Sequence, residues 1–325
     1  MSESSVSRDS SPVKVAIAFE ISAPLLSKVK STPVPVEVVA ATSREKLTPA
    51  QLAEAEVVIC WDFGPEQLAL SPKLRWIHKM STGVDRMLYP EFVQSPVVLT
   101  NAAGAHAIPI AEHVIGVMLA MVKELPKAAR RQRQHQWIKE HTRELYGQTL
   151  GIVGMGHVGT AIARLAKAMS MTTLAVRRRD LPAQFVDEMV PMEQLHQMLG
   201  RSDFVVVTLP LTPSTRGMFG PEEFRAMRPG AYFINIARGQ IVREDALIDA
   251  LRTGKIAGAM LDVAAVEPLP AESPLWDMEN VIITPHTSGH STRVNERAMD
   301  LFCENLVRYR KGEALVNVVD KLAGY

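Results

Sequence analysis

The sequence contains little cysteine, with two residues, Cys60 and Cys303, in a chain of 325. Two thiols so far apart in the sequence cannot form the disulfide framework of a small secreted domain or the closely spaced cysteine pair of a zinc finger. We expect no metal site. We also expect a reducing compartment, and the cytoplasm is the default location.

Neither sign of charge dominates the composition. The sequence has 36 Lys and Arg against 35 Asp and Glu, which gives a formal net charge of +1. This balance excludes a protein that binds nucleic acid through an overall polycation field. A local basic stretch does occur at residues 127–143. Only Trp137 and Tyr146 could stack on bases there, so a solvated helix followed by a loop is the favoured interpretation, without a nucleic-acid partner.

Long apolar runs are absent as well. The longest candidate, residues 114–122, is far shorter than the roughly 18–20 residues that cross a bilayer. Residues 1–12 are rich in serine and lack an apolar signal core, so they are predicted to be a disordered tail. The sequence therefore predicts a soluble protein with no membrane partner.

Short apolar runs alternate with helical patterns along most of the chain. Such alternation is typical of βαβ units and parallel sheets, and roughly 100–200 residues per domain favours two domains here. A first series of strands is predicted at 13–19, 34–40, 55–60, 74–79 and 97–100. A second series is predicted at 149–153, 172–176, 204–208, 231–235, 256–262 and 281–284.

Four helical patterns stand out between and after these strands. Residues 108–125 are apolar around much of the helix circumference, which indicates burial between domains or subunits. Residues 158–169 and 243–253 lie between strands of the second series. Residues 292–311 form a long amphipathic pattern, whose last residues could return the chain to the first domain.

The strongest local motif is a glycine-rich turn, GMGHVG at residues 154–159. Gly154 would permit a tight turn, Gly156 would let a pyrophosphate approach the backbone, and Gly159 would let the helix pack closely on the strand. The pyrophosphate would then face unpaired N–H groups at the start of a helix. A glycine pattern alone is weak evidence, but the strand before it and the helix after it predict a dinucleotide site.

The end of the next strand bears on which dinucleotide is bound. In NAD-selective folds an acidic residue about 20 positions downstream binds the ribose hydroxyls. Arg177 occupies that place and is followed by Arg178 and Arg179. Guanidinium groups bind a 2′-phosphate through charge-assisted bonds, whereas a carboxylate would repel it. A surface basic run is the alternative. At this offset we expect NADP(H), with NAD(H) as the second choice.

Three segments end strands of the second series, at residues 234–239, at 259–263 leading to 267–268, and at 283–289. In an open parallel sheet, ligands bind beyond the carboxyl ends of the strands, so these segments can converge on one crevice. They carry an arginine, a glutamate and a histidine in that order.

Together these three side chains suit 2-oxo acid chemistry. Arg238 could hold the substrate carboxylate or carbonyl oxygen, and His286 could protonate that oxygen as hydride arrives. Glu267 would orient the imidazole and favour its protonated form. Taken singly, each residue has a structural alternative: a surface arginine, a turn glutamate and a histidine buried in the core. Behind a dinucleotide loop, the set of three favours catalysis.

At these positions the sequence resembles the D-isomer-specific 2-hydroxyacid dehydrogenase family. The matching segments are GMGHVG at 154–159, NIARG at 235–239, LDVAAVEP at 261–268, PLWDMENVIITPH at 274–286 and ENLVRYRKGEALVNVVD at 304–320. The resemblance covers essentially everything after the tail.

The resemblance implies an α/β fold with two Rossmann-like or flavodoxin-like domains and parallel sheets. A dinucleotide-binding domain, 102–287, would be inserted in a substrate domain made of 13–101 and 288–325. It also implies a homodimer in which the long helix after Asn101 contributes to the interface.

The resemblance also assigns residues. Arg238 matches the substrate-binding arginine, Glu267 the histidine's partner and His286 the acid–base. Asp262 matches the residue that contacts the nicotinamide amide. Cofactor contacts are implied for Gly154, Met155, Gly156, His157, Val158, Gly159, Pro210, Thr215, Ile236, Ala237, Arg238, Asp262, His286 and Gly289.

Residues 81–85 resemble the loop whose N–H groups, at Gly83 and Val84, grip the substrate carboxylate, although an ordinary turn is the alternative. Pocket shape should depend on residues 61–63 and 80–82, which include the predicted substrate contacts Trp61 and Thr82. Trp61 and Phe63 could equally be core residues.

These residues predict a reductase that uses NADPH to convert glyoxylate, hydroxypyruvate or a similar 2-oxo acid to the D-2-hydroxy acid. Arg177, in place of the family's commoner acid, resembles the NADPH-preferring glyoxylate and hydroxypyruvate reductase branch. The alternative is a nucleotide-sensing binding protein or corepressor that kept the fold without turnover. The intact set of Arg238, Glu267 and His286 weighs against it, because a sensor needs no acid–base.

Overall fold

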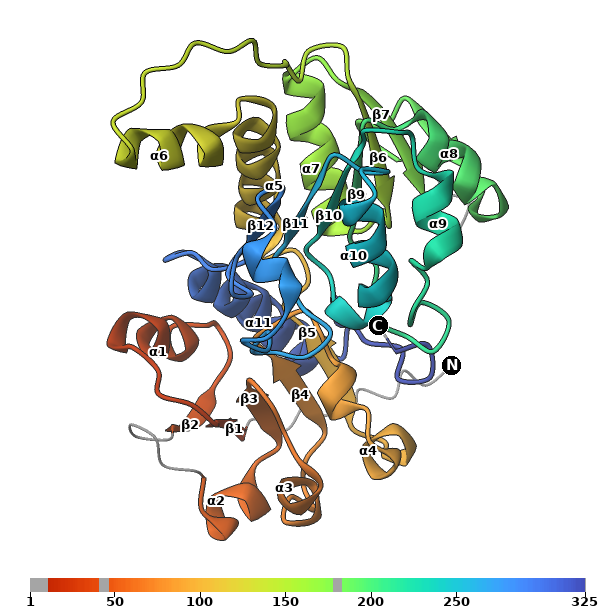
Figure 1. The fold of residues 1–325 in the computed structure, drawn as a ribbon. Helices are drawn as coiled ribbons and strands as arrows, with labels where there is room; N and C mark the ends of the chain where they lie inside the picture. The colour runs from red at the N-terminus through yellow and green to blue at the C-terminus, as the bar shows by residue number, and fades with distance from the viewer. Residues whose placement is uncertain (1–10, 41–46, 178–182, 325) are drawn as a thin grey trace. The chain divides into compact units, whose positions relative to one another are not determined.

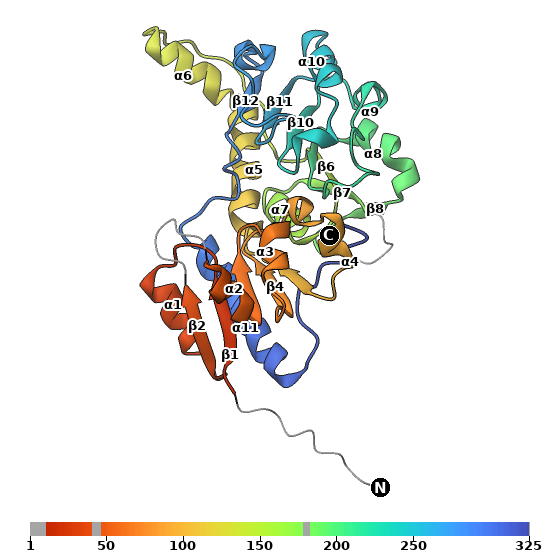
Figure 2. The same cartoon turned by 90° about the horizontal axis from the view of Figure 1, so that it is seen from below.

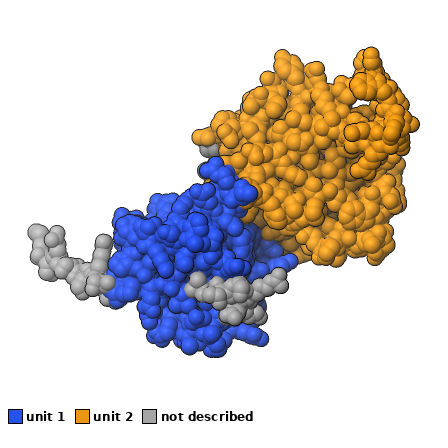
Figure 3. All heavy atoms as spheres, turned by 90° about the vertical axis from the view of Figure 1, so that its left-hand side faces the viewer, with its two compact units in different colours: residues 1–105, 292–325 blue, residues 106–291 orange. Residues whose placement is uncertain are grey.

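A computed structural model describes residues 11–40, 47–177 and 183–324 (Figure 1). The chain divides into two compact units (Figure 3), unit 1 with residues 1–105 and 292–325, and unit 2 with residues 106–291. Unit 2 is therefore inserted between the two segments of unit 1. The sequence placed these divisions at 101 and 287. Residues 1–10 of the predicted tail lie outside the described residues.

Unit 1 contains a five-stranded parallel sheet in the order β2-β1-β3-β4-β5. This is the flavodoxin-like strand order. Its elements are β1 (Val13–Ile17), α1 (Ala23–Lys30), β2 (Val36–Ala40), α2 (Pro49–Glu54), β3 (Val57–Cys60), α3 (Pro65–Ala69), β4 (Trp76–Lys79), α4 (Pro90–Gln94), β5 (Val98–Asn101) and α11 (Val294–Lys311).

Helices cover both faces of this sheet (Figure 2). Alternate strand residues such as Val15 and Ile59 pack with α1 and with Phe302 of α11. The residues between them, such as Ala16 and Val58, pack with α2, α3 and α4. The amphipathic helix predicted at 292–311 thus returns the chain to unit 1, because its apolar stripe completes the core on one face.

Unit 2 contains a seven-stranded parallel sheet in the order β12-β11-β10-β9-β6-β7-β8. Counted from β6, this is the doubly wound dinucleotide-fold order with one added strand. Its elements are α5 (Ala107–Val122), α6 (Leu125–Arg133), β6 (Thr149–Val153), α7 (His157–Ala168), β7 (Thr172–Val176), β8 (Glu188–Val190), α8 (Leu195–Arg201), β9 (Phe204–Val207), α9 (Pro221–Ala226), β10 (Tyr232–Asn235), α10 (Glu244–Arg252), β11 (Gly258–Leu261) and β12 (Val281–Ile283).

Two apolar clusters cover the faces of the unit 2 sheet. On one face, Val205 and Phe233 pack against α8, α9 and α10. On the other face, Val206 and Ile234 pack against α5 and α7. The two parallel sheets confirm the predicted α/β fold class.

The eleven predicted strands are present, each within two residues of its expected limits. The long helix predicted at 108–125 corresponds to α5, but it ends three residues earlier than expected, at Val122, and α6 begins at Leu125. Glu124 between them adopts a left-handed backbone with φ of 52°. The cause is Pro126, whose ring would clash with the carbonyl of Val122 in a continuous helix. β8 was missed because three edge residues carry no alternation.

The basic stretch forms a solvated helix followed by a loop, as predicted. α6 is fully described, and none of its residues is buried. Lys127 and Arg131 both pair with Glu140 in the loop that follows. No helix in the described part of the chain is long and apolar enough to span a membrane.

His78 lies on β4 inside the core of unit 1. The Thr100 hydroxyl accepts a hydrogen bond of 2.8 Å from the Trp76 indole and lies 2.8 Å from His78 Nδ1. The Phe302 ring packs beside the imidazole. Burial lowers the pKa of His78 from 6.5 to about 4, which keeps the ring neutral near neutral pH.

Acid is therefore expected to destabilise unit 1 through His78. As pH falls from 6.5 towards 4, the unfolded chain binds a proton that the folded chain does not. The stability present above that range is lost progressively, by about 2 kcal/mol at about pH 5. Thermal unfolding at about pH 7.5 and about pH 5 measures this loss. The fall in Tm should be smaller for His78→Asn than for wild type.

The matched control is His135→Asn, since His135 is exposed and its φ of 56° suits asparagine. Its fall in Tm should equal that of wild type. Equal falls in His78→Asn and wild type would show that His78 does not carry the acid sensitivity.

Candidate active site

The glycine turn joins β6 to α7. Gly154 has φ of +110°, and a Cβ there would lie 2.8 Å from Thr208 Oγ1. A Cβ on Gly159 would lie 2.4 Å from the Gly154 carbonyl oxygen, so α7 can approach β6 this closely only with glycine. A Cβ on Gly156 would meet nothing within 4 Å, which leaves open space beside that backbone. Each glycine therefore meets the local requirement that a dinucleotide turn imposes.

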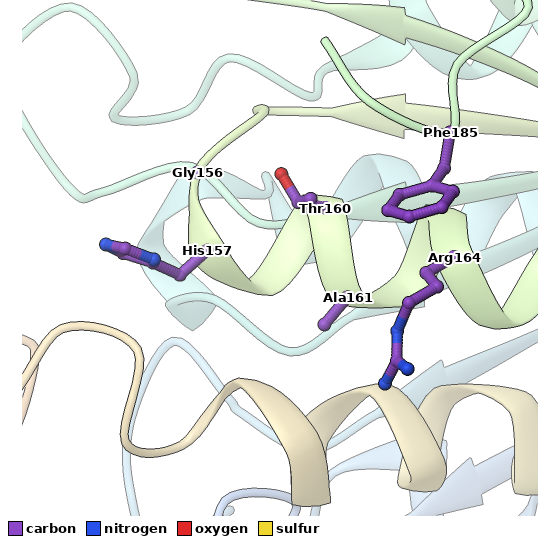
Figure 4. Close-up of a pocket in the computed structure, with 6 residues that line it drawn as sticks. All are labelled: Gly156, His157, Thr160, Ala161, Arg164 and Phe185. Atoms are coloured by element: carbon purple, nitrogen blue, oxygen red, sulfur yellow. The ribbon is translucent and has the colours of Figure 1, made fainter.

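The N-terminus of α7 faces the same open space. Within the described residues no side chain caps this helix, so its first N–H groups are available to an anion. A pocket of about 470 Å³ runs along its first turns, and Phe185, which comes from outside α7, lines it together with residues of the helix (Figure 4). The lining residues are Gly156, His157, Thr160, Ala161, Arg164 and Phe185.

Arg177 follows β7 directly. Val176 pairs with Val153, and the Gly154 N–H donates to the Val176 carbonyl at 2.9 Å. The half-buried Arg177 therefore lies beyond the same sheet edge as the glycine turn. Arg178 and Arg179 lie outside the described residues.

The loop after β9 closes on itself beside this edge. Val207 pairs with Val153, so residue 208 begins next to the glycine turn. The Thr215 hydroxyl donates to the Pro210 carbonyl at 2.7 Å and accepts from the Thr212 N–H at 2.8 Å. Pro210 and Thr215, both predicted cofactor contacts, are thus held together in one turn.

Arg238 lies in a tight turn after β10. The Asn235 side chain closes this turn, because its amide donates to the Arg238 carbonyl and its oxygen accepts from the Ala237 N–H, each at 3.1 Å. A Cβ on Gly239 would lie 1.9 Å from the Ala264 carbonyl carbon. The turn that carries Ile236, Ala237 and Arg238 therefore rests directly on the segment leading to Glu267.

His286 and Glu267 form a pair. His286 Nδ1 lies 2.9 Å from Glu267 Oε2, and Glu267 Oε1 accepts from the Ala264 N–H at 3.2 Å. Both side chains are partly exposed. Because Nδ1 faces the carboxylate, the Nε2 edge of the ring is the one left for a substrate. The backbone of His286 is left-handed, with φ of 54°, a conformation rare outside glycine and found at functional sites.

Asp262 holds the loop that carries His286. Asp262 is 1% exposed, and its carboxylate accepts from the Thr284 hydroxyl at 2.6 Å and from the Thr287 N–H at 2.9 Å. It also accepts from the N–H and the hydroxyl of Ser288, and its carbonyl accepts from the His286 N–H at 2.8 Å. In this structure the hydrogen bonds of Asp262 therefore fix the loop that carries His286. The nicotinamide contact stays a prediction.

The predicted substrate loop lies in unit 1. The Asn101 amide donates to the Thr82 carbonyl at 2.8 Å, and the Ala102 N–H donates to the Ser81 carbonyl at 3.3 Å. β5 thereby holds residues 81–84 at the carboxyl end of β4. Thr82 is exposed, Gly83 is half-buried and Val84 is buried.

Trp61 and Phe63, which follow β3, differ in burial. Phe63 is a core residue of unit 1, whereas Trp61 is partly exposed and its ring packs on Phe19 at 6.0 Å. Of the two, Trp61 is the one that can contact a ligand.

The predicted residues thus form two sets. Unit 2 brings together the glycine turn, Arg177, Arg238, Glu267 and His286 along one sheet edge. Unit 1 brings together Trp61 and residues 82–84. Gly289 ends the His286 loop, and a Cβ there would lie 3.2 Å from His106 Cδ2. Among the described residues no His, Cys, Asp or Glu cluster could hold a metal ion.

Sequence reasoning missed the side chains that hold the site. Thr284 and Ser288 flank His286 and bind Asp262. Asn235 closes the Arg238 turn. Their only signal was polar side chains directly after apolar strands, at positions where buried carboxylates and turn N–H groups need partners.

Comparison with known proteins gives a consistent result. The family model described as D-isomer specific 2-hydroxyacid dehydrogenase, NAD binding domain, matches residues 115–288. The chain is 36% identical over 265 residues to the glyoxylate reductase of Korarchaeum cryptofilum, which covers 79% of each chain.

Two solved structures share the fold. The D-isomer specific 2-hydroxyacid dehydrogenase of Xanthobacter autotrophicus Py2, in complex with NADPH, has a TM-score of 0.86 and 31% identity, covering 97% of this chain and 100% of that one. The NADPH-dependent glyoxylate/hydroxypyruvate reductase of Sinorhizobium meliloti, in complex with NADP and sulfate, has a TM-score of 0.83 and 28% identity, covering 96% and 100%.

Proposed function

Because this chain belongs to the D-isomer specific 2-hydroxyacid dehydrogenase family, a family of NAD(P)-dependent oxidoreductases, we propose that it reduces a small 2-oxo acid with NADPH. Glyoxylate and hydroxypyruvate are the substrates we favour, and the product is the D-2-hydroxy acid. The named activities of the Korarchaeum and Sinorhizobium relatives support this choice.

The observation that carries the proposal is the His286–Glu267 pair on a fixed loop. A carboxylate 2.9 Å from Nδ1 orients the ring so that Nε2 is presented to a substrate. His286 then donates the Nε2 proton to the carbonyl oxygen during reduction and takes it back in the reverse direction. Arg238 holds the substrate and stabilises negative charge that develops on that oxygen.

The residues of unit 2 fit a bound dinucleotide. The open backbone at Gly156 and the uncapped start of α7 would hold the pyrophosphate. We place the remaining contacts on the loops that end β7, β9, β10, β11 and β12, as the resemblance implies. When bound, the reduced nicotinamide supplies the hydride.

We propose NADPH over NADH because Arg177 stands where NAD-selective folds carry an acid. Replacing Arg177 and Arg178 by glutamine should raise the KM for NADPH by about tenfold or more, since charge-assisted bonds to the 2′-phosphate are lost. The KM for NADH should change little. Steady-state kinetics with both cofactors measures the ratio.

Arg201→Gln is the matched control. Arg201 at the end of α8 pairs with Glu188 of β8, so its loss should leave both KM values unchanged. An equal loss for NADPH and NADH in the double variant would remove the 2′-phosphate role.

We assign the substrate carboxylate to the N–H groups of Gly83 and Val84, with Thr82 and Trp61 beside them. The Asn101 amide holds the backbone of this loop at the Thr82 carbonyl, which supports this assignment.

Chiral analysis of glycerate formed from hydroxypyruvate tests the stereochemical part of the proposal. D-glycerate is expected, and L-glycerate would contradict it.

We also propose that the protein works as a homodimer in the cytoplasm. Three large apolar side chains in and after α6 are exposed, with Trp137 at 91%, Ile138 at 53% and Leu125 at 54%, and a second copy would bury them. Light scattering should give about twice the chain mass of 35.8 kDa.

Both cysteines are free, which suits the reducing environment of the cytoplasm.

A further inference from the structure

Lys79 is a buried lysine at the carboxyl end of β4. Its side chain is 6% exposed, and its Nζ donates to Asp62 Oδ1 at 2.7 Å and to the Trp61 carbonyl oxygen. Lys79 pairs in register with Cys60, the last residue of β3, so its ammonium group lies beside residues 61–62, which follow that strand. One side chain thus ties together the ends of two neighbouring strands.

Burying this ammonium group costs stability, which suggests that the arrangement has a function. Removing an ammonium from water is unfavourable, and an apolar side chain of similar length would fill the space without that cost. The partner carboxylate is not removed from water, because Asp62 is 57% exposed. The Cys60 thiol beneath the pair stays neutral, since burial raises its pKa to about 12. Lys79 and Asp62 therefore set the local charge.

The pair lies at the sheet edge where the substrate is proposed to bind. Two residues after Lys79 the chain enters the loop 81–84. The Lys79 bond to the Trp61 carbonyl fixes the backbone from which the exposed Trp61 ring extends towards Phe19. An unpaired carboxylate at Asp62 would repel an incoming 2-oxo acid, which is itself an anion.

We propose that Lys79 is a positioning residue of the substrate site, which fixes Trp61 and cancels the charge of Asp62 so that an anionic 2-oxo acid can bind. This inference rests on the proposed function. It assigns Lys79 no contact with the substrate, because its Nζ is already held by Trp61 and Asp62.

Steady-state kinetics with hydroxypyruvate and saturating NADPH tests this role. Lys79→Met should raise the KM for hydroxypyruvate about tenfold and change kcat less than about threefold, because ground-state binding is what is lost. Adding Asp62→Asn to that variant should recover most of the KM, since the repelling charge is removed. Lys79→Arg should stay near wild type, because a guanidinium can donate to both partners.

Lys73→Met is the matched control, because Lys73 is an exposed lysine of unit 1 that pairs with Glu54. It should leave KM unchanged. An unchanged KM in Lys79→Met would overturn the proposal. So would a double variant no better than Lys79→Met, which would mean that Lys79 does not act by cancelling the charge of Asp62.

A second readout does not depend on activity. In a chain carrying Trp137→Phe and Trp276→Phe, the remaining indoles are the exposed Trp61 and the buried Trp76. Lys79→Met should increase acrylamide quenching of the Trp61 fluorescence, and unchanged quenching would contradict the positioning of Trp61. A wild-type protein without reductase activity would instead overturn the proposed function, while this quenching result would still report on Lys79.

Discussion

Replacing His286 with alanine is expected to lower kcat for 2-oxo acid reduction by about 10²–10⁴-fold, the usual contribution of a general acid. The Kd for NADPH should change little, because the cofactor is proposed to rest on the glycine turn and the loops beside it. The reason is local. Glu267 holds Nδ1 of His286 at 2.9 Å, and Nε2 is the proton donor that alanine removes.

His290→Ala is the matched control, since His290 is an exposed histidine four residues further along the same loop. It should retain kcat within about threefold. A His286→Ala variant with near-normal kcat would remove His286 from the acid–base role. A large rise in the NADPH Kd with unchanged kcat would move its role to cofactor binding.

Replacing Asp262 with asparagine is expected to lower both the Tm and the rate of 2-oxo acid reduction. The new amide group would face N–H and O–H donors of Thr284, Thr287 and Ser288, so buried donors would lose their acceptor. Each such loss costs about 1–3 kcal/mol, and Tm should fall. The loop would no longer fix His286, and a misplacement of about 1 Å can cost about 10²-fold in rate.

Asp187→Asn provides the control for losing a hydrogen-bonded carboxylate in the same unit. Asp187 accepts from the Thr173 N–H at 2.8 Å and pairs with Lys167. Its loss should lower Tm without a comparable fall in kcat. If Asp262→Asn weakens NADPH binding and spares kcat, the carboxylate acts on the nicotinamide rather than on the loop.

The sequence was informative wherever a property depends on neighbours in the chain. The strand at 149–153, the glycine spacing after it and the helix that follows were predicted because each rests on local geometry. The end of α5 at Val122 was placed three residues too late although Pro126 signals it, because the apolar pattern continues to Leu125. β8 was missed because its pairing with β7, and not its own residues, makes it a strand.

The site shows the same division. Arg238, Glu267 and His286 could be named because each directly follows a strand. The Lys79–Asp62 pair could not be named, since its partners lie 17 residues apart and meet only through the register of β3 and β4. Nothing local marks Lys79 as buried, because a lysine near a strand end is usually solvated.

The initial rate of NADPH oxidation by the purified protein, across a panel of 2-oxo acids, tests whether the chain is a 2-oxo acid reductase. We predict saturable oxidation with glyoxylate or hydroxypyruvate, a higher kcat/KM with NADPH than with NADH, and loss of that rate in His286→Ala. Tight NADPH binding without turnover on any acid of the panel would contradict it, and would indicate a protein that senses the nucleotide instead.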